Sequence, residues 1–138
     1  MTVMDAVIAF VSARLDEDEA VARAVQDSSE PWPGQWEAAD ENYALRTHNG
    51  WVLATAGTPG GEFRPGVLAH LARHDPASAL RDTAAKRKIV RRCAARMNEM
   101  DRYPNGLVSP RALLARQVLT DLAAAWDDHP DYDPGWVS

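Results

Sequence analysis

Apolar residues recur every three or four positions through the first 27 residues, and this spacing predicts one long amphipathic helix. Thr2 is a good N-cap residue, so we expect the helix to run from about Thr2 to about Asp27. The apolar positions that share its buried face are Val3, Met4, Val7, Ile8, Val11, Leu15, Val21, Ala22 and Val25. Prolines at positions 31 and 33 end the periodicity, because proline lacks a backbone N–H and disfavours helix just before it.

From Trp36 to Gly57 the spacing changes to the alternation that is typical of strands. Asn49-Gly50 is the best hairpin signal in the chain, since both residues accept the positive φ angles of a type I′ turn. We therefore expect Tyr43–His48 to pair with Trp51–Ala56. This register places two pairs of residues opposite each other, Arg46 with Leu53 and Leu45 with Ala54. A lone hairpin is marginal in water, so it is expected to pack on the helices.

Residues 65–126 are predicted to be helical. A short helix is expected over Pro65–Arg73, and Asp75-Pro76 supplies the N-cap and first residue of a long helix that ends near Tyr103–Gly106. Ser109-Pro110 repeats this start signal. It opens a last helix to about Trp126, whose buried face is expected to comprise Leu114, Ala115, Val118, Leu119, Leu122, Ala125 and Trp126.

The tail, residues 127–138, carries Tyr132 and Trp136 and is expected to wrap across the helices. The chain has 138 residues, which is the size of one domain. The sequence thus predicts a single α+β domain, mainly helical. It would hold three long helices (the first over residues 1–27), a short helix, and one hairpin within residues 36–57.

Charge is distributed unevenly along the chain, whose net charge is −5. Residues 1–42 are strongly acidic and residues 81–102 are strongly basic. The acidic and basic elements are expected to pair with each other, or the basic helix meets an outside polyanion. The exposed basic stripe of that helix is predicted to comprise Arg81, Arg87, Lys88, Arg91, Arg92 and Arg102. Taking Ile89 as the centre of the buried arc places Asp82 and Lys86 within it, as a partly buried ion pair.

Composition narrows the class of protein. The apolar fraction of 46% is that of a soluble globule, no apolar run reaches the length of a membrane span, and the first residues lack a secretory signal. The lone cysteine, Cys93, excludes an internal disulfide and fits the reducing cytoplasm. No DNA-binding spacing accompanies the bases, so a protein partner is favoured over nucleic acid, and a homo-oligomer is an open alternative.

Metal binding is the sharpest chemical hypothesis. His70 and His74 stand four residues apart on one predicted helix, so both imidazoles can reach one ion, and His129 in the tail could complete a zinc site. The alternative is that these histidines pack and cap locally, with Asp75 occupied as an N-cap. Cys93 lies mid-helix on an apolar face, as inert core thiols do, and no serine has the context of a nucleophile.

Two segments carry a resemblance to a known family. They are His70-Leu-Ala-Arg-His74-Asp-Pro, followed by Leu80-Arg81 and Ala85-Lys86-Arg87, and Asp128-His129-Pro130-Asp131-Tyr132 with Trp136. The chain resembles small, uncharacterised actinobacterial and phage-associated proteins that share a domain of unknown function. The resemblance implies a shared architecture and a phage or accessory role, and it supplies no activity. We expect a non-enzymatic accessory protein that binds another macromolecule. The alternative is a small metal-binding protein or metal-dependent enzyme that uses His70, His74 and His129.

Overall fold

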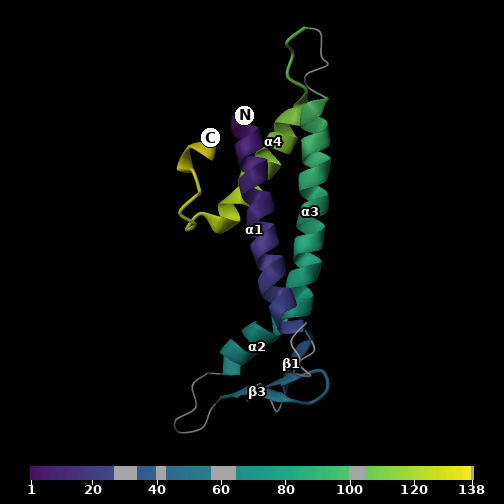
Figure 1. Ribbon diagram of the computed structural model, residues 1–138, viewed down its shortest axis with the longest axis vertical. Coiled ribbons are helices and arrows are strands. Elements are labelled where there is room, and N and C mark those ends of the chain that lie inside the picture. The colour runs from purple at the N-terminus through teal and green to yellow at the C-terminus, as the bar shows by residue number, and fades with distance from the viewer. Residues whose placement is uncertain (27–33, 40–42, 57–64, 100–104, 138) are drawn as a thin grey trace. The chain divides into compact units, whose positions relative to one another are not determined.

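Helices dominate the fold, and three short strands interrupt them (Figure 1). A computed structural model describes residues 1–26, 34–39, 43–56, 65–99 and 105–137. Its elements, in chain order, are α1 (Val3–Gln26), β1 (Trp36–Ala39), β2 (Ala44–Thr47), β3 (Val52–Thr55), α2 (Pro65–Arg73), α3 (Pro76–Asn98) and α4 (Pro110–Ala123), then short 3-10 helices at Ala124–Trp126 and Pro134–Trp136. The mainly helical α+β class is confirmed. None of the helices described is long and apolar enough to cross a membrane.

The chain divides into two compact units. The first unit comprises residues 1–17 and 84–138, and the second comprises residues 18–83. Helices α1 and α3 each contribute residues to both units. The single domain expected from the chain length stays a prediction.

α1 begins where the sequence predicts, because Thr2 and Asp5 form a reciprocal capping box. The Thr2 hydroxyl accepts a hydrogen bond from the Asp5 N–H (3.1 Å), and the Asp5 carboxylate accepts one from the Thr2 N–H (2.8 Å). The hydrogen bonds that the Thr2 backbone and side chain donate hold the pKa of Asp5 below its ordinary value. Two of the orphan donors at the helix start are thereby satisfied.

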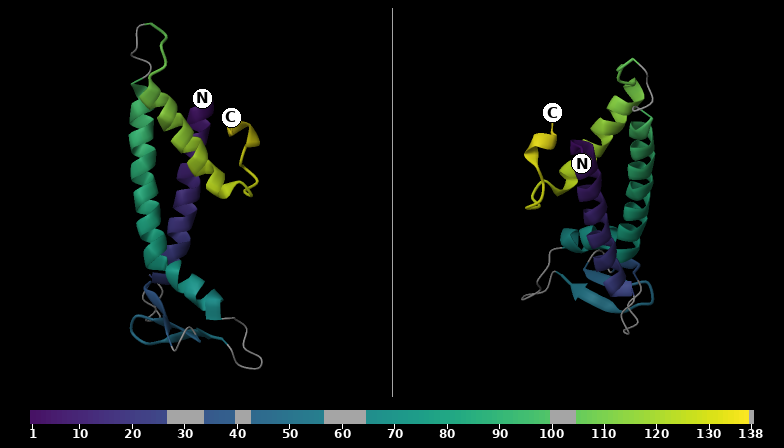
Figure 2. Two further views of the ribbon diagram at one scale, coloured as in Figure 1. Left: turned by 180° about the vertical axis from the view of Figure 1, so that it is seen from behind. Right: turned by 45° about the horizontal axis from the view of Figure 1, so that its top comes forward.

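The core of the first unit forms where α1, α3 and α4 meet, with α4 lying across the other two helices (Figure 2). Its buried residues are Met4, Val7, Phe10, Val11, Leu15, Val90, Cys93, Ala115, Leu119 and Ala123. Several burial predictions need correction: on the predicted buried faces, Val3 and Val21 of α1 are 57% and 71% exposed, and Ala125 after α4 is exposed. Ile89 is 37% exposed, so the buried arc of α3 is centred nearer Val90, and Leu114 of α4 is 61% exposed. The buried positions of α4 are Ala112, Ala115, Leu119 and Ala123, and Leu114 lies outside this stripe.

The C-terminal tail packs against α1, as the sequence predicts. Tyr132 and Trp136 both contact the core, and their ring centroids lie 5.9 Å and 5.1 Å from that of Phe10. The two tail rings also meet edge to face at 5.5 Å. Such tilted arrangements are favourable for aromatic rings. The tail is therefore an integral part of the first unit.

In the second unit the three strands form an antiparallel sheet in the order β1-β2-β3. The predicted hairpin is present as β2 and β3, whereas β1 adds a strand that the sequence analysis did not separate. Leu45 pairs with Ala54 as predicted, but a bulge after Leu45 pairs Arg46 with Val52 instead of Leu53. The sheet packs on α2 through Leu45, Ala56 and Leu68.

The hairpin turn also differs from the predicted type I′ turn. The Gly50 N–H donates to the Thr47 carbonyl (2.9 Å), and the Thr47 N–H donates to the Trp51 carbonyl (2.8 Å). Gly50 has φ +95°, a conformation that glycine adopts without strain. The buried Thr47 hydroxyl accepts from the Trp51 N–H (3.0 Å) and so anchors the longer loop. A longer loop with one positive-φ glycine accommodates the bulge.

α2 and the start of α3 match their predicted boundaries. Asp75 is buried and caps α3, since its Oδ1 accepts the Ser78 N–H at 2.7 Å. Its Oδ2 accepts the Trp36 N–H at 2.9 Å and thereby ties β1 to the start of α3. The far end of α3 is corrected to Asn98, before the predicted stop near Tyr103–Gly106, of which residues 103–104 lie outside the described residues. Ser109 precedes α4 without a side-chain cap.

Candidate functional site

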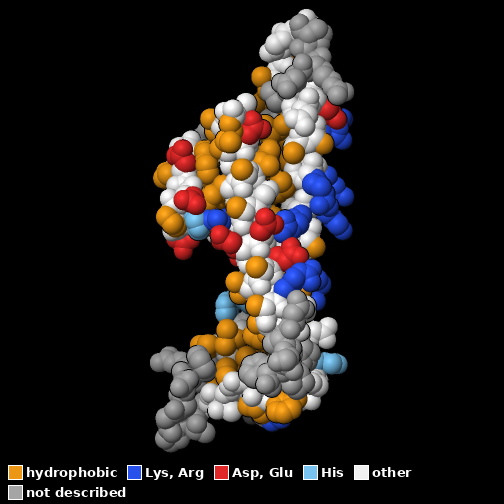
Figure 3. Space-filling view, viewed as in Figure 1, with side chains coloured by type: hydrophobic (Ala, Val, Ile, Leu, Met, Phe, Trp, Pro, Cys, Tyr) orange, Lys and Arg blue, Asp and Glu red, His pale blue; other side chains and the backbone are white. Residues whose placement is uncertain are grey.

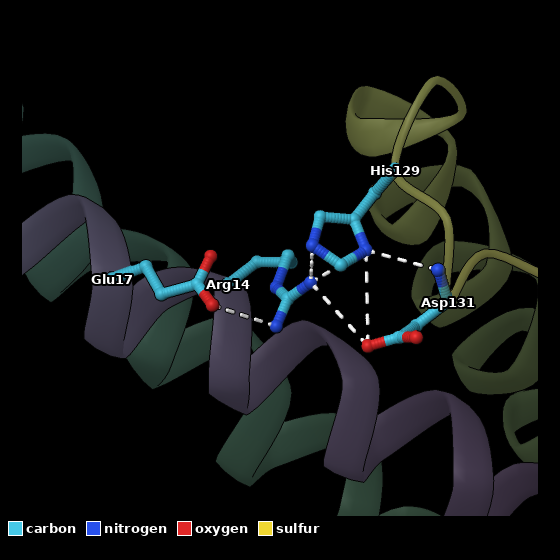
Figure 4. Close-up of polar contacts among 4 residues, drawn as sticks. All are labelled: Arg14, Glu17, His129 and Asp131. Carbon is cyan, nitrogen blue, oxygen red and sulfur yellow. Dashed lines mark hydrogen bonds and ion pairs between the residues drawn. The ribbon is translucent and has the colours of Figure 1, made fainter.

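Arg14 is the centre of a polar cluster in the first unit (Figure 4). Its side chain is only 8% exposed. One guanidinium nitrogen, Nη2, donates to Glu17 on the same helix at 2.8 Å, and the other, Nη1, contacts the imidazole of His129 in the tail. A carboxylate oxygen of Asp131 lies 4.0 Å from Nη1. The carboxylates of Glu17 and Asp131 therefore compensate the buried charge, and the imidazole of His129 adds a polar contact.

The side chain of Arg14 also packs against the aromatic ring of Phe10. The Arg14 guanidinium lies 5.3 Å from the ring centroid of Phe10, and the His129 ring meets that of Phe10 edge to face at 5.7 Å. The Asp131 N–H donates to Nδ1 of His129 at 3.1 Å and orients the imidazole. The arrangement is a structural anchor for the tail. It contains no nucleophile paired with a base.

A second candidate is the basic surface of α3, which Figure 3 shows as Lys and Arg side chains gathered along that helix. We call Lys88, Arg91 and Arg92 the basic face. All three side chains are exposed, and no ion pair is seen for them within the described ranges. Unpaired cations on one helix face can meet an acidic partner.

The remaining members of the predicted basic stripe behave differently. Arg87 donates to Asp16 of α1 at 2.7 Å, which realises the expected pairing between acidic and basic elements. Arg81 belongs to the second unit, where it donates to the Ser78 hydroxyl at 2.9 Å. Arg102 lies outside the described residues. Lys88, Arg91 and Arg92 thus form the part of the predicted stripe that is exposed in the first unit without an ion pair among the described residues, and the full stripe stays a prediction.

The predicted ion pair between Asp82 and Lys86 on α3 stays a prediction, and the structure adds an aromatic contact of Lys86. Lys86 is half-buried, and its ammonium lies 5.4 Å from the ring centroid of Trp126, which is a cation–π distance. Asp82 is exposed and belongs to the second unit. A buried partner for Lys86 is therefore an aromatic ring that the helical spacing of α3 alone cannot reveal.

The proposed metal ligands fall in both units. His70 lies in the last turn of α2 and His74 directly follows the helix, and their ring centroids are 4.4 Å apart. His129 lies in the first unit against Arg14. No three His, Cys, Asp or Glu side chains in the described part of the chain are grouped so that they could hold a metal ion. A site formed by all three histidines stays a prediction.

A cavity of about 310 Å³ lies in the second unit, lined in part by Val21, Val25, Trp36 and His74. The indole N–H of Trp36 is buried and has no acceptor among the described residues. Asp18, Asp82 and Thr83 also line the cavity, and the Thr83 hydroxyl donates to the Leu80 carbonyl at 3.0 Å.

Arg14 is the residue that the sequence analysis missed. The signal was present, because Arg14 follows Phe10 by four residues and Val11 by three, and these positions share the buried face of the helix. A basic residue on an apolar face requires a partner, since an unpaired buried charge is costly. The identity of that partner, His129, depends on the tertiary fold.

Comparison with known proteins gives one family. Neither the curated proteins nor the solved structures that were searched contain a match to the chain. A family of unknown function (DUF6221) matches residues 4–138, which covers nearly the whole chain, including the Arg14 cluster and the basic face. The chain belongs to this family.

Proposed function

We propose that this protein is a non-enzymatic accessory protein of the cytoplasm that binds an acidic surface of another protein through its basic face. The observation that carries the proposal is the contrast along α3. Arg87 is paired with Asp16, whereas its neighbours Lys88, Arg91 and Arg92 are exposed without an ion pair in the described residues. Exposed arginines arranged at helical spacing favour an outside partner of opposite charge.

A protein partner fits these residues better than nucleic acid. The whole chain carries a net charge of −5, which opposes non-specific approach to a phosphate backbone. The resemblance to small actinobacterial and phage-associated proteins supports an accessory role beside a larger machinery. The lone Cys93 fits a reducing compartment.

The test combines cross-linking with charge reversal. A photo-reactive amino acid at position 88 should capture a protein partner in cells, and the purified partner should then bind the wild-type chain directly. The double variant Lys88→Glu/Arg91→Glu should weaken that binding at least tenfold, whereas Arg116→Glu, an exposed arginine on α4, should leave it within twofold. Binding of double-stranded DNA that the double variant abolishes would overturn the proposal in favour of nucleic acid.

A second candidate function is metal binding, favoured by the 4.4 Å separation of the His70 and His74 rings. Two imidazoles at i and i+4 can share one ion, and His129 is the proposed third ligand. Calorimetric titration of the untagged chain with zinc tests this directly. Binding that is lost in His70→Ala and unchanged in His48→Ala would support the site, and His129→Ala would then decide the third ligand. Equal binding by wild type and His70→Ala would overturn it.

A further inference from the structure

An apolar groove runs between α3 and α4 in the first unit. It encloses about 260 Å³, and its apolar lining comes from Cys93 on α3 and from Leu114, Ala115 and Val118 on α4. The α4 residues fall at i, i+1 and i+4, so they follow one face of that helix. The groove shares Arg92 with the basic face and includes no residue of the Arg14 cluster.

The buried residues at the base of the groove are small and uncharged, whereas the leucine at its edge is exposed to solvent. Cys93 and Ala115 are buried, but Leu114 is 61% exposed. Burial raises the pKa of the Cys93 thiol, so the floor stays neutral near pH 7. A single exposed leucine is ordinary, but Leu114 extends the apolar lining of the groove toward solvent.

Arginines border the groove on both sides. Arg92 and Arg96 come from α3, and Arg111 comes from α4. Arg96 is partly neutralised, since it donates to both carboxylate oxygens of Glu99 at 3.0 Å. Arg92 and Arg111 have no ion pair within the described residues. Both rims of the groove therefore carry net positive charge.

We propose that this groove binds an amphipathic helix of the partner protein, with apolar residues in the groove and Asp or Glu along both flanks. The inference rests on the proposed function and specifies the partner's chemistry. Acidic flanks follow from the arginines on both rims, because complementary charges fix orientation and register. At about 260 Å³ the groove lies just below the size of the usual small-molecule site, which is about 300–1,000 Å³. A shallow groove between two helices instead suits side chains at i, i+3, i+4 and i+7 of a docked helix.

A second copy of this chain fits the groove poorly. Its acidic helix is α1, but the apolar residues of that helix, among them Val7, Val11 and Leu15, are buried in its own core. Docking of α1 from a second copy would remove these residues from that core. The occupant is therefore a helix from another protein.

The test uses two fluorescent peptides of about 15 residues, long enough for four helical turns. One carries Leu at i, i+3, i+4 and i+7 with Glu on both flanks, and the other has the same composition in scrambled order. Fluorescence anisotropy with the full chain should give at least tenfold tighter binding of the amphipathic peptide. Equal affinities would overturn the inference, because they would reflect charge alone.

Matched variants test whether the peptide binds in the groove. Arg111→Glu and Leu114→Asp should each weaken binding about tenfold. Their controls, Arg116→Glu and Leu113→Asp, alter exposed α4 residues that do not line this groove, and each should leave binding within twofold. Arg111→Glu changes an exposed side chain, so it remains informative if Leu114→Asp lowers stability. Control variants that weaken binding as strongly would overturn the inference.

Binding measurements with the partner that cross-links at position 88 distinguish this inference from the proposed function. If that partner binds Leu114→Asp as tightly as wild type, the groove inference fails and the proposed function stands. If the peptide binds as expected but no protein is captured through the basic face, the proposed function fails. Light scattering that shows a dimer lost in Leu114→Asp would overturn the inference in favour of a second copy.

Discussion

Arg14 in α1 contacts the imidazole of His129, which lies 115 positions later in the chain. This contact joins the first helix of the first unit to its tail. It explains why a basic residue can occupy the apolar face of α1, since the imidazole, Glu17 and the Phe10 ring surround the guanidinium. Arg14 therefore links α1 to the tail and is not a solvated surface charge.

Replacement of Arg14 by Ala should lower the free energy of unfolding by about 2 kcal/mol, because packing on Phe10 and the contact with His129 are lost together. Arg23→Ala is the control, since the Arg23 side chain is 55% exposed and its ion pair with Glu19 is worth well below about 1 kcal/mol. Urea unfolding followed by circular dichroism measures both. Equal losses in the two variants would show that Arg14 does not anchor the tail.

The tail aromatics should contribute more than any other residues of the last segment. Trp136→Ala should cost about 2–3 kcal/mol, because a half-buried indole leaves its contact with Phe10. Val137→Ala, whose side chain is 63% exposed, should cost below about 0.5 kcal/mol. Deletion of residues 127–138 should lower stability by several kcal/mol. Thermal unfolding checks all three, and an unchanged melting temperature after the deletion would contradict the packed tail.

Local signals explain most of what the sequence predicted. The predicted starts of α2 and α3 match because each helix begins with a proline, and Asp75 caps α3 through a hydrogen bond from a residue three positions later. The tail contact was expected from its two aromatic residues, Tyr132 and Trp136, and both pack on the core. The mainly helical class followed from periodicity alone.

The predictions were wrong where contacts between residues far apart in the sequence determine the local structure. The bulge after Leu45 and the hydroxyl of Thr47 shift the hairpin register by one residue, and neither is encoded in Asn49-Gly50. Ile89 and Leu114 both lie beside buried positions, and only the approach of α4 determines which side chain is covered. The partner of Arg14 is likewise a property of the tertiary fold.

Lys86→Ala should destabilise the chain by about 0.5–1 kcal/mol more than Lys88→Ala. Lys86 is half-buried with its ammonium over Trp126, whereas Lys88 is exposed. A double-mutant cycle with Trp126→Leu isolates the interaction and should give a coupling energy of the same size. Equal small effects of the two lysine variants, with no coupling, would rule out the cation–π contact.

The capping box at Thr2 makes part of the stability depend on pH. The pKa of Asp5 is lowered in the folded chain by the hydrogen bonds from Thr2, so the unfolded state binds the proton more tightly. The contribution of Asp5 is therefore complete above the unfolded pKa and is lost as the pH falls through the folded pKa. Urea unfolding across this range should show the stability difference between wild type and Asp5→Asn shrinking on acidification. A constant difference would contradict the assignment, and Asp128→Asn, an exposed carboxylate, is the control.

Asp75 should couple the start of α3 to strand β1, because its two oxygens accept from Ser78 and Trp36. Asp75→Ala should cost about 2 kcal/mol, since it removes an N-cap and strands a second N–H. Asp75→Asn keeps only one acceptor oxygen and should lose about half as much. Hydrogen exchange separates the two bonds: both the Ser78 and Trp36 amides should exchange faster in Asp75→Ala. Faster exchange at Ser78 alone would mean that Asp75 caps the helix without holding the strand.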